Sequence, residues 1–328
     1  MCPGGMMNMA VTDVMDSVGA SWPDAHVNAD AMARLAAGMH EFAGVENLGA
    51  PFCMTVEAEA LGAEVCLGTK ETEPRVTTYA MDDLRELDRL GSMNPARGRA
   101  ATVAEATRLM STSYPVVPTI ADLTGPISLA TSLVEPLQFY RAMRREPAAA
   151  HALLEVATEA AIVFGDALVD AGAVAACIAD PSATGELIGG RLFTQFALPY
   201  VNQIVTHFAA RDIPSIVHIC GNIRTLGEAL PRIAAPVISI DSVVGLNVLR
   251  RLAPSHLTMG NVSTYLLEYG KPGTLAKVAA SKTAAGVDIL APACGIGART
   301  PLRNIRALAD AVAGNNESEA RRSYVASA

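Results

Sequence analysis

Short apolar runs alternate with helical patterns along the whole chain, and this alternation constrains the fold more than any other feature. In the second half, runs rich in Val, Ile and Ala occupy Val174–Ala179, Ser215–Ile219 and Val237–Ile240, with helix-like or turn-rich segments between them. Strands that alternate with helices form parallel sheets, because each helix returns the chain to the start of the next strand. The pattern therefore predicts an α/β protein.

Seven such strands are recognisable, and a fragment at Met1–Gly5 supplies an eighth. The seven are expected at Asn47–Cys53, Tyr114–Ala121, Val174–Ala179, Ser215–Ile219, Val237–Ile240, Leu257–Gly260 and Val287–Ala291. Eight βα units imply a closed (β/α)8 TIM barrel, here as a single domain over residues 1–328. An open doubly wound sheet is the alternative. Against it, no G-x-G-x-x-G phosphate-binding turn follows an early strand.

The predicted helices have recognisable first residues. Asn28 is a plausible N-cap for a helix over Val27–Phe42. Thr300 is expected to cap the closing helix, with Pro301 at its first position. The stretch Leu67–Arg75 is expected to be irregular. Further helices are expected at Met81–Leu90, Pro95–Met110, Ile127–Val134, Pro136–Arg145, Pro147–Ala171 and Arg191–Arg211.

Polar or sulfur-containing side chains stand at or just after the ends of these strands. They are Asp122, Asp180, His218, Cys220, Asp241, Asn261 and Cys294. The carboxyl ends of the strands of a (β/α)8 barrel meet at one mouth, where active sites of this fold are found. The sequence therefore places its candidate functional residues together.

A metal site is the most specific prediction among them. Side chains alternate along a strand, so His218 and Cys220 point to the same side of theirs, and Cys294 follows the last strand. One imidazole and two thiolates with a fourth position left open is the ligand count of a catalytic zinc. For the first two residues alone, a buried strand with one satisfied histidine and one inert cysteine is the better explanation. The third ligand shifts the balance to zinc.

Composition restricts the partners. The chain of 328 residues is 51% hydrophobic with a net charge of −8, which is enough apolar material for a full core. An acidic balance without a basic run argues against nucleic acid or an anionic membrane as a partner. The six cysteines, at positions 2, 53, 66, 177, 220 and 294, lack disulfide-framework spacing. Reduced thiols in the cytoplasm are therefore expected.

At the strand-end residues the sequence resembles the methylcobamide:coenzyme M methyltransferases, a branch of the uroporphyrinogen decarboxylase superfamily. The His218-x-Cys220 pair with the distant Cys294 carries the specific part of the resemblance. Further matching segments are Cys2–Met9, Pro51–Glu59, Thr124–Ala130 and Asp180–Gly185. The resemblance implies a uroporphyrinogen decarboxylase-like (β/α)8 barrel. It also implies that the three residues bind Zn2+, and that a methyl group moves from a methylated corrinoid protein to coenzyme M.

Two departures from that family bear on the expectations. Family members begin with a helix and a full first strand ahead of the segment at Cys2, so we expect either a truncated first strand or a start codon placed late. The alanine-rich composition differs from that of methanogen members, so the acceptor is left open between coenzyme M, another small thiol and tetrahydrofolate. No Asp-x-His-x-x-Gly segment for cobalt ligation occurs, so the corrinoid is expected to arrive on a partner protein.

The proposed chemistry favours a thiol acceptor. A free thiol is mostly protonated at neutral pH, whereas the thiolate is the reactive form. Zinc deprotonates a thiol that it binds and leaves the sulfur nucleophilic. A folate nitrogen gains less from a thiophilic metal.

Four other residues are candidates with alternative structural roles. Asp180 could orient a ligand or meet the substrate, or it could cap the turn at Pro181. Glu57 could complete the zinc shell in the absence of substrate, or serve only the structure. Asn222 and Asn261 could donate hydrogen bonds to an anionic group of the acceptor, with turn or cap duty as the alternative.

Two other functions remain in view. A uroporphyrinogen decarboxylase would need arginines near the first strand, and the first arginine of this chain is Arg34. A non-enzymatic barrel that only binds a corrinoid protein would hold a structural zinc with four protein ligands.

Overall fold

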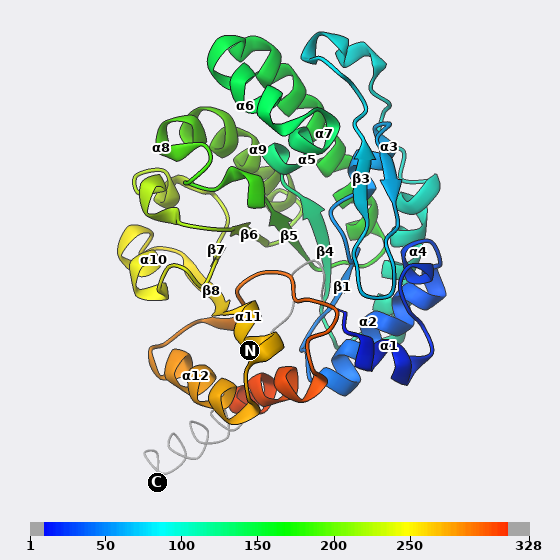
Figure 1. Cartoon of the computed structure of the whole chain (residues 1–328), viewed down its shortest axis with the longest axis vertical. Helices are drawn as coiled ribbons and strands as arrows, with labels where there is room; N and C mark the ends of the chain where they lie inside the picture. Colours follow the sequence, from blue (N-terminus) through cyan, green and yellow to red (C-terminus); the bar gives the residue numbers. More distant parts are fainter. Residues whose placement is uncertain (1–9, 314–328) are drawn as a thin grey trace.

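The computed structural model describes residues 10–313 (Figure 1). Seven parallel strands form one sheet in the order β1-β4-β5-β6-β7-β8-β9. The strands curl around a common centre with the helices outside them, as Figure 1 shows, which is the (β/α)8 arrangement that the alternation predicts. Their bounds are β1 Leu48–Ala50, β4 Thr119–Thr124, β5 Ala175–Ala179, β6 Ser215–Ile219, β7 Val237–Ile240, β8 Leu257–Val262 and β9 Ile289–Pro292. The strand expected at Met1–Gly5 lies outside the described residues.

Most helices begin where the sequence predicts them. Asn28 caps α2, because its side-chain oxygen accepts a hydrogen bond from the amide of Ala31 at 3.0 Å. Helices α5, α6 and α7 each have a proline in the first turn, where the missing N–H costs no hydrogen bond. The helices are α1 Thr12–Val18, α2 Ala29–Ala43, α3 Val56–Ala60, α4 Gly98–Ser113, α5 Pro126–Leu133, α6 Pro136–Arg145, α7 Pro147–Asp170, α8 Gly189–Leu192, α9 Leu198–Ala209, α10 Leu246–Leu252, α11 Thr264–Tyr269 and α12 Pro272–Ala284.

The long helix expected over Arg191–Arg211 is interrupted. A π-helical turn, Phe193–Ala197, separates α8 from α9. Pro199 follows in the first turn of α9. Because proline has no backbone N–H, it cannot donate the i→i−4 hydrogen bond of a regular α-helix, and the wider π-helical turn lies directly before it.

Two strand ends and one helix differ from the prediction. Asp122 and Asn261 were expected just after their strands, but they lie inside β4 and β8 and are buried. The stretch Leu67–Arg75, expected to be irregular, is mostly the loop of an antiparallel hairpin, β2 Glu64–Cys66 with β3 Arg75–Thr78, which stands outside the parallel sheet (Figure 1). Only a short 3-10 helix, Leu84–Arg89, occupies the segment expected as Met81–Leu90.

The cap of the last helical segment, residues 302–313, is also different. The hydroxyl of Thr300 is buried without a hydrogen-bond partner and caps nothing. Instead, the amide of Leu302 donates to Oδ2 of Asp13 in α1 at 2.9 Å. A cap supplied from the other end of the chain cannot be found in the local sequence.

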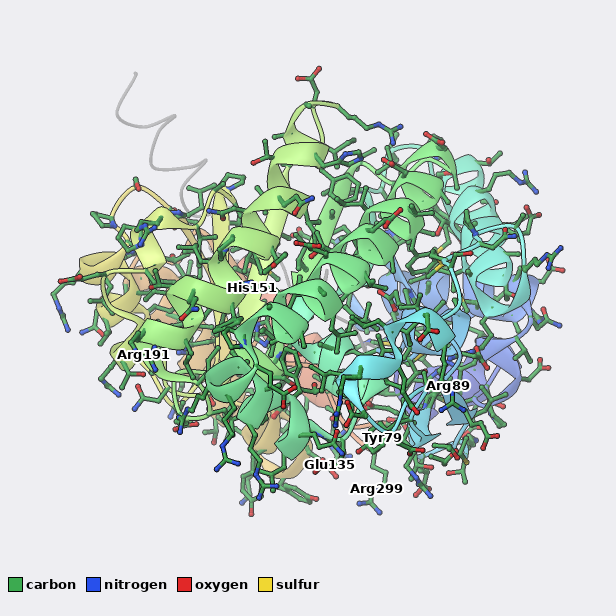
Figure 2. All side chains as sticks on the ribbon, turned by 90° about the horizontal axis from the view of Figure 1, so that it is seen from above. Tyr79, Arg89, Glu135, His151, Arg191 and Arg299 are labelled. Carbon is green, nitrogen blue, oxygen red and sulfur yellow. The ribbon has the colours of Figure 1, made fainter. Side chains whose placement is uncertain are left out.

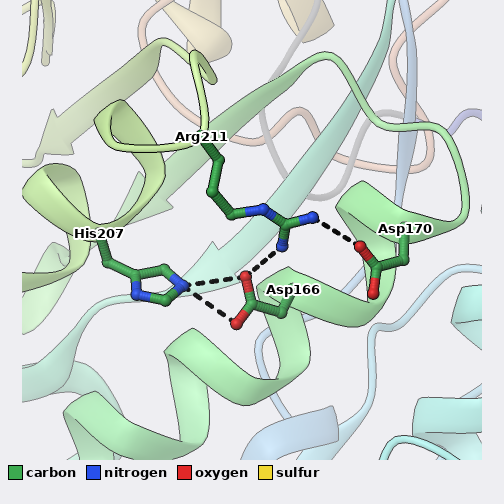
Figure 3. Close-up of polar contacts among 4 residues, drawn as sticks. All are labelled: Asp166, Asp170, His207 and Arg211. Carbon is green, nitrogen blue, oxygen red and sulfur yellow. Dashed lines mark hydrogen bonds and ion pairs between the residues drawn. The ribbon is translucent and has the colours of Figure 1, made fainter.

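Helices α7 and α9 pack closely against each other and the barrel. A Cβ atom on Gly165 of α7 would lie 2.3 Å from the ring of Phe208 in α9 and 2.9 Å from Leu123 in β4. Near the C-terminal ends of the two helices, Asp166 accepts hydrogen bonds from His207 and Arg211, and Arg211 also pairs with Asp170 (Figure 3).

Candidate metal centre

Three side chains that are distant in sequence meet at the end of β6. The Nε2 atom of His218 lies 3.0 Å from Sγ of Cys220, and the two sulfur atoms of Cys220 and Cys294 lie 3.3 Å apart. All three ligand atoms fall within 4.8 Å of one another. Within residues 10–313, no other group of three or more His, Cys, Asp and Glu side chains is arranged to hold one metal ion.

The strands explain why these residues meet. His218 is the fourth residue of β6, and Cys220 directly follows that strand. Cys294 follows β9, which pairs with β8. His218 is buried, whereas both cysteines are partly exposed. The imidazole is therefore fixed in the barrel wall, and the sulfur atoms face the mouth.

The two thiols form a hydrogen-bonded pair. This hydrogen bond is the main reason why the pKa of Cys294 is lowered, and His218 lowers it further. The same hydrogen bond, together with burial, raises the pKa of Cys220. The pair therefore favours the thiolate form at Cys294, and thiolates are the form that binds zinc.

The donor set fits a zinc ion. Nitrogen and thiolate sulfur are preferred zinc ligands, at about 2.0 and 2.3 Å from the metal, so neighbouring ligands of a tetrahedral site lie about 3.5–3.8 Å apart. The observed separations of 3.0 and 3.3 Å are slightly shorter. An ion would only need to spread the three side chains by roughly half an ångström.

Ser239 of β7 contacts the other side of the histidine ring. Its Oγ lies 3.0 Å from Nδ1 of His218. Ser239 is not among the site residues predicted from the sequence. The available signal was a single polar side chain in the apolar strand Val237–Ile240, two residues before Asp241 and therefore on the same face of that strand.

The predicted candidate Glu57 is fully buried in α3. Its two carboxylate oxygens accept hydrogen bonds from the amide of Thr124 at 2.7 Å and from the hydroxyl of Thr124 at 3.0 Å. Burial raises the pKa of Glu57. Burial and then the charge of Glu57 raise the pKa of Asp122 well above its ordinary value. These two carboxyl groups form a buried acidic pair beside the end of β4.

Asp180, the second predicted catalytic candidate, caps a helix. Its carboxylate accepts hydrogen bonds from the amide of Ile127 at 3.2 Å, and from the amide and hydroxyl of Ser128 at 2.8 and 2.7 Å. Burial raises the pKa of Asp180 to about 6. The structural role expected for Asp180 was to cap the turn at Pro181. The structure shows that it caps the first turn of α5 instead.

The two asparagines have structural partners. Asn222 caps the short helix Ile223–Leu226 by accepting from the amide of Arg224 at 3.1 Å. Asn261 donates both amide hydrogens to backbone carbonyls, those of Asp241 at 2.8 Å and Val244 at 2.7 Å. Both amide hydrogens of Asn261 therefore have backbone partners, in line with the alternative of turn or cap duty.

The rim of the mouth contains residues that the sequence analysis did not single out. Glu73 comes from the loop of the β2–β3 hairpin, and burial together with the charge of Cys294 raises its pKa to about 7. The neighbouring Glu71 lies 3.8 Å from Arg299 in the loop after β9, which ties the hairpin to the mouth. Figure 2 shows Tyr79, Glu135 and Arg299 along one edge of the molecule.

Exposed apolar side chains occur in the segments that follow three of the strands. Tyr265 and Tyr269 of α11 are 74% and 62% exposed, and their ring centroids lie 4.7 Å apart. Leu187 after β5 and Val243 after β7 are exposed as well. Exposed aromatic groups of this kind are typical of surfaces that contact another molecule.

Comparisons with known proteins identify relatives of the chain. A family model described as Uroporphyrinogen decarboxylase (URO-D) matches residues 1–314. The chain is 33% identical over 308 residues to the Methylcobamide:CoM methyltransferase MtaA of Methanosarcina barkeri, covering 91% of this chain and 88% of the relative. It is 31% identical over 298 residues to MtbA, a Methylcobamide:CoM methyltransferase of Methanosarcina mazei, covering 90% and 88%.

A uroporphyrinogen decarboxylase is similar over a smaller part. The enzyme of Anaeromyxobacter dehalogenans is 32% identical over 204 residues, covering 60% of this chain and 58% of the relative. Among solved structures, a methyltransferase from Methanosarcina mazei superposes with a TM-score of 0.86 at 30% identity, covering 95% of this chain and 94% of the other.

No helix within residues 10–313 has the length and apolar character needed to cross a membrane.

Proposed function

The chain belongs to the uroporphyrinogen decarboxylase (URO-D) family, and from this premise we propose that it is a zinc-dependent methyltransferase which moves a methyl group from a methylated corrinoid protein to a small thiol such as coenzyme M. The observation that carries the proposal is the convergence of His218, Cys220 and Cys294, whose ligand atoms lie within 4.8 Å of one another. The relatives that match about nine tenths of the chain are methyltransferases, which supports the reaction class.

His218, Cys220 and Cys294 would hold the metal. When bound, zinc lowers the pKa of a thiol that it coordinates and leaves the sulfur nucleophilic. The two protein thiolates neutralise the charge of the ion, so an acceptor sulfur keeps its electron density. The partial exposure of both cysteines on the mouth side leaves an approach for the acceptor.

The donor is proposed to arrive on a partner protein. The names of the relatives specify a methylcobamide as the methyl source, and a corrinoid is large, so its carrier must cover the barrel mouth to bring cobalt to the metal centre. The exposed side chains of Leu187, Val243, Tyr265 and Tyr269 support this arrangement, because the buried core of a protein interface is more apolar than its rim and is enriched in aromatic residues.

Transfer of a methyl group from free methylcobalamin tests the reaction without the partner. The zinc-loaded protein is mixed with methylcobalamin and either coenzyme M or tetrahydrofolate, and the methylated product is quantified. We expect methyl-coenzyme M from the wild type. Cys66→Ser, which alters an exposed cysteine on the hairpin, should behave like the wild type, and Cys294→Ser should lose at least 100-fold in rate.

Other products would indicate the other functions. Methylation of tetrahydrofolate alone would reject the thiol and favour the folate-dependent alternative. Release of CO2 from uroporphyrinogen, with no methyl transfer, would favour a decarboxylase, the activity named for the relative that matches 60% of the chain.

A further inference from the structure

The ring of His218 is held from behind by a serine on the neighbouring strand. His218 and Ser239 are paired residues in the parallel register of β6 and β7, and both are buried. Side chains of paired residues point to the same side of a sheet, so register alone brings the hydroxyl to the ring. The resulting separation of Ser239 Oγ and His218 Nδ1 is 3.0 Å.

The two ring nitrogens therefore have different surroundings. Nδ1 faces the serine hydroxyl, and Nε2 lies 3.0 Å from Sγ of Cys220. In a neutral imidazole one nitrogen carries the hydrogen and the other the lone pair, and the hydrogen-bond partner decides which is which. A hydroxyl accepting from Nδ1–H leaves the lone pair on Nε2, directed at the two sulfurs.

We propose that Ser239 is the positioning residue of the metal centre: its hydroxyl accepts a hydrogen bond from Nδ1 of His218 and so presents the Nε2 lone pair to zinc. The inference rests on the proposed function, because it requires that His218 binds the ion. Ser239 does not touch the metal or the acceptor. It acts by fixing both the tautomer and the rotation of the ring.

The choice of a hydroxyl also affects the charge of the centre. Histidine ligands of zinc commonly donate their second N–H to a carboxylate or a backbone carbonyl, and a carboxylate adds a negative charge. The hydroxyl of Ser239 orients the ring without adding charge. Two thiolates and one neutral imidazole then balance Zn2+, and the partner of the imidazole adds no further negative charge.

Substitutions at two positions separate positioning from general packing. Ser239→Ala removes the acceptor and frees the ring to rotate, and loss of such partners weakens metal binding by about 10–100-fold. The matched control is Ser215→Ala. Ser215 begins β6, is equally buried, and its hydroxyl has no hydrogen-bond partner. That variant should bind zinc as the wild type does.

A second pair covers the case in which Ser239→Ala does not fold. Ser239→Thr keeps the hydroxyl and adds one methyl group, whereas Ser239→Val has nearly the same shape without the hydroxyl. We expect zinc to bind Ser239→Val about 10–100-fold more weakly than Ser239→Thr, because only the hydrogen-bond acceptor differs between them.

The readout is the zinc dissociation constant, measured by competition with a chromophoric chelator, together with the visible absorption of the Co2+-substituted protein. A shifted cobalt spectrum in Ser239→Ala and Ser239→Val, but not in Ser215→Ala, would support the inference. If the wild type binds zinc stoichiometrically and the four variants bind it within about twofold of one another, positioning by Ser239 is wrong while the proposed function stands. If the wild type itself binds no zinc, the proposed function fails.

Discussion

The carboxylate of Asp180 holds the backbone amide and the hydroxyl of Ser128, which comes 52 residues earlier in the chain. This contact joins the end of β5 to the first turn of α5. Asp180 also lies close enough to Cys220 for its charge to contribute to the raised pKa of that thiol. A single buried carboxylate thus caps a helix and also influences a thiol of the candidate metal centre.

Asp180→Ala should destabilise the protein. The variant loses three hydrogen bonds and leaves the amides of Ile127 and Ser128 without this partner, which should cost about 2–3 kcal/mol of unfolding free energy. Urea unfolding followed by circular dichroism measures the loss. Ser132→Ala, which removes a half-buried hydroxyl from the same helix, should change the free energy by less than about 1 kcal/mol. An effect of Asp180→Ala no larger than this control would contradict the capping role.

Gly125→Ala should be destabilising for a related reason. A Cβ atom at this position would lie 2.4 Å from Cβ of Asp180, and that atom cannot swing away as the tip of a long side chain could. We expect a loss of about 1–3 kcal/mol, measured by the same unfolding experiment. Gly273→Ala is the control, since a Cβ atom there has nothing within 4 Å. Equal stabilities of the two variants would show that the close approach is unimportant.

The local sequence specified some elements fully and others not at all. Ser215–Ile219 and Pro136–Arg145 have their predicted bounds, because a β-branched run and a proline in the first turn are local signals. The ends of β4 and β8 were misplaced by up to three residues, since Asp122 and Asn261 are polar yet buried. Asn261 accepts a hydrogen bond from Lys282 of a distant segment, and Asp122 lies near Glu57, whose charge helps to raise its pKa.

The candidate site shows the same division. His218, Cys220 and Cys294 could be singled out because their residue types and strand-end positions carry the signal. The role of the Ser239 hydroxyl could not be predicted from the sequence, because it depends on the β6–β7 register. The hydrogen-bond partners of Asn261 could not be predicted either, since they are backbone carbonyls of another loop. Residue type indicates chemistry, whereas the direction of a hydrogen bond requires the tertiary structure.

The buried acidic pair should make stability fall as the pH rises. Burial raises the pKa of both Glu57 and Asp122 in the folded state, so the folded protein retains protons that the unfolded chain has released. The contribution to stability is therefore complete below about pH 4 and is lost above it, by up to about 1.4 kcal/mol per pH unit for each group. Asp122→Asn cannot ionise, so its unfolding free energy should fall less between pH 4.5 and pH 7.5. A fall equal to that of the wild type would contradict a protonated Asp122.

The ion-pair network between α7 and α9 should respond in the opposite direction. Burial alone would raise the pKa of Asp166, but hydrogen bonds from His207 and Arg211 outweigh it and lower the pKa (Figure 3). A lowered pKa contributes stability above the unfolded value near 4, and this contribution is lost as the pH falls through the folded value. Because the side chains are about one-third exposed, Asp166→Asn should cost only about 0.5–1 kcal/mol at pH 7. Unfolding in 1 M NaCl should remove most of this difference, and a cost that does not change with salt or with acid would contradict an electrostatic origin.

Metal analysis of the purified protein decides whether His218, Cys220 and Cys294 hold an ion. Zinc per chain is measured by elemental analysis after dialysis against metal-free buffer, for the wild type, Cys220→Ser, Cys294→Ser and the control Cys66→Ser. We expect one zinc per chain in the wild type and in Cys66→Ser, and a small fraction of that in the other two variants. Stoichiometric zinc in both Cys220→Ser and Cys294→Ser would contradict it.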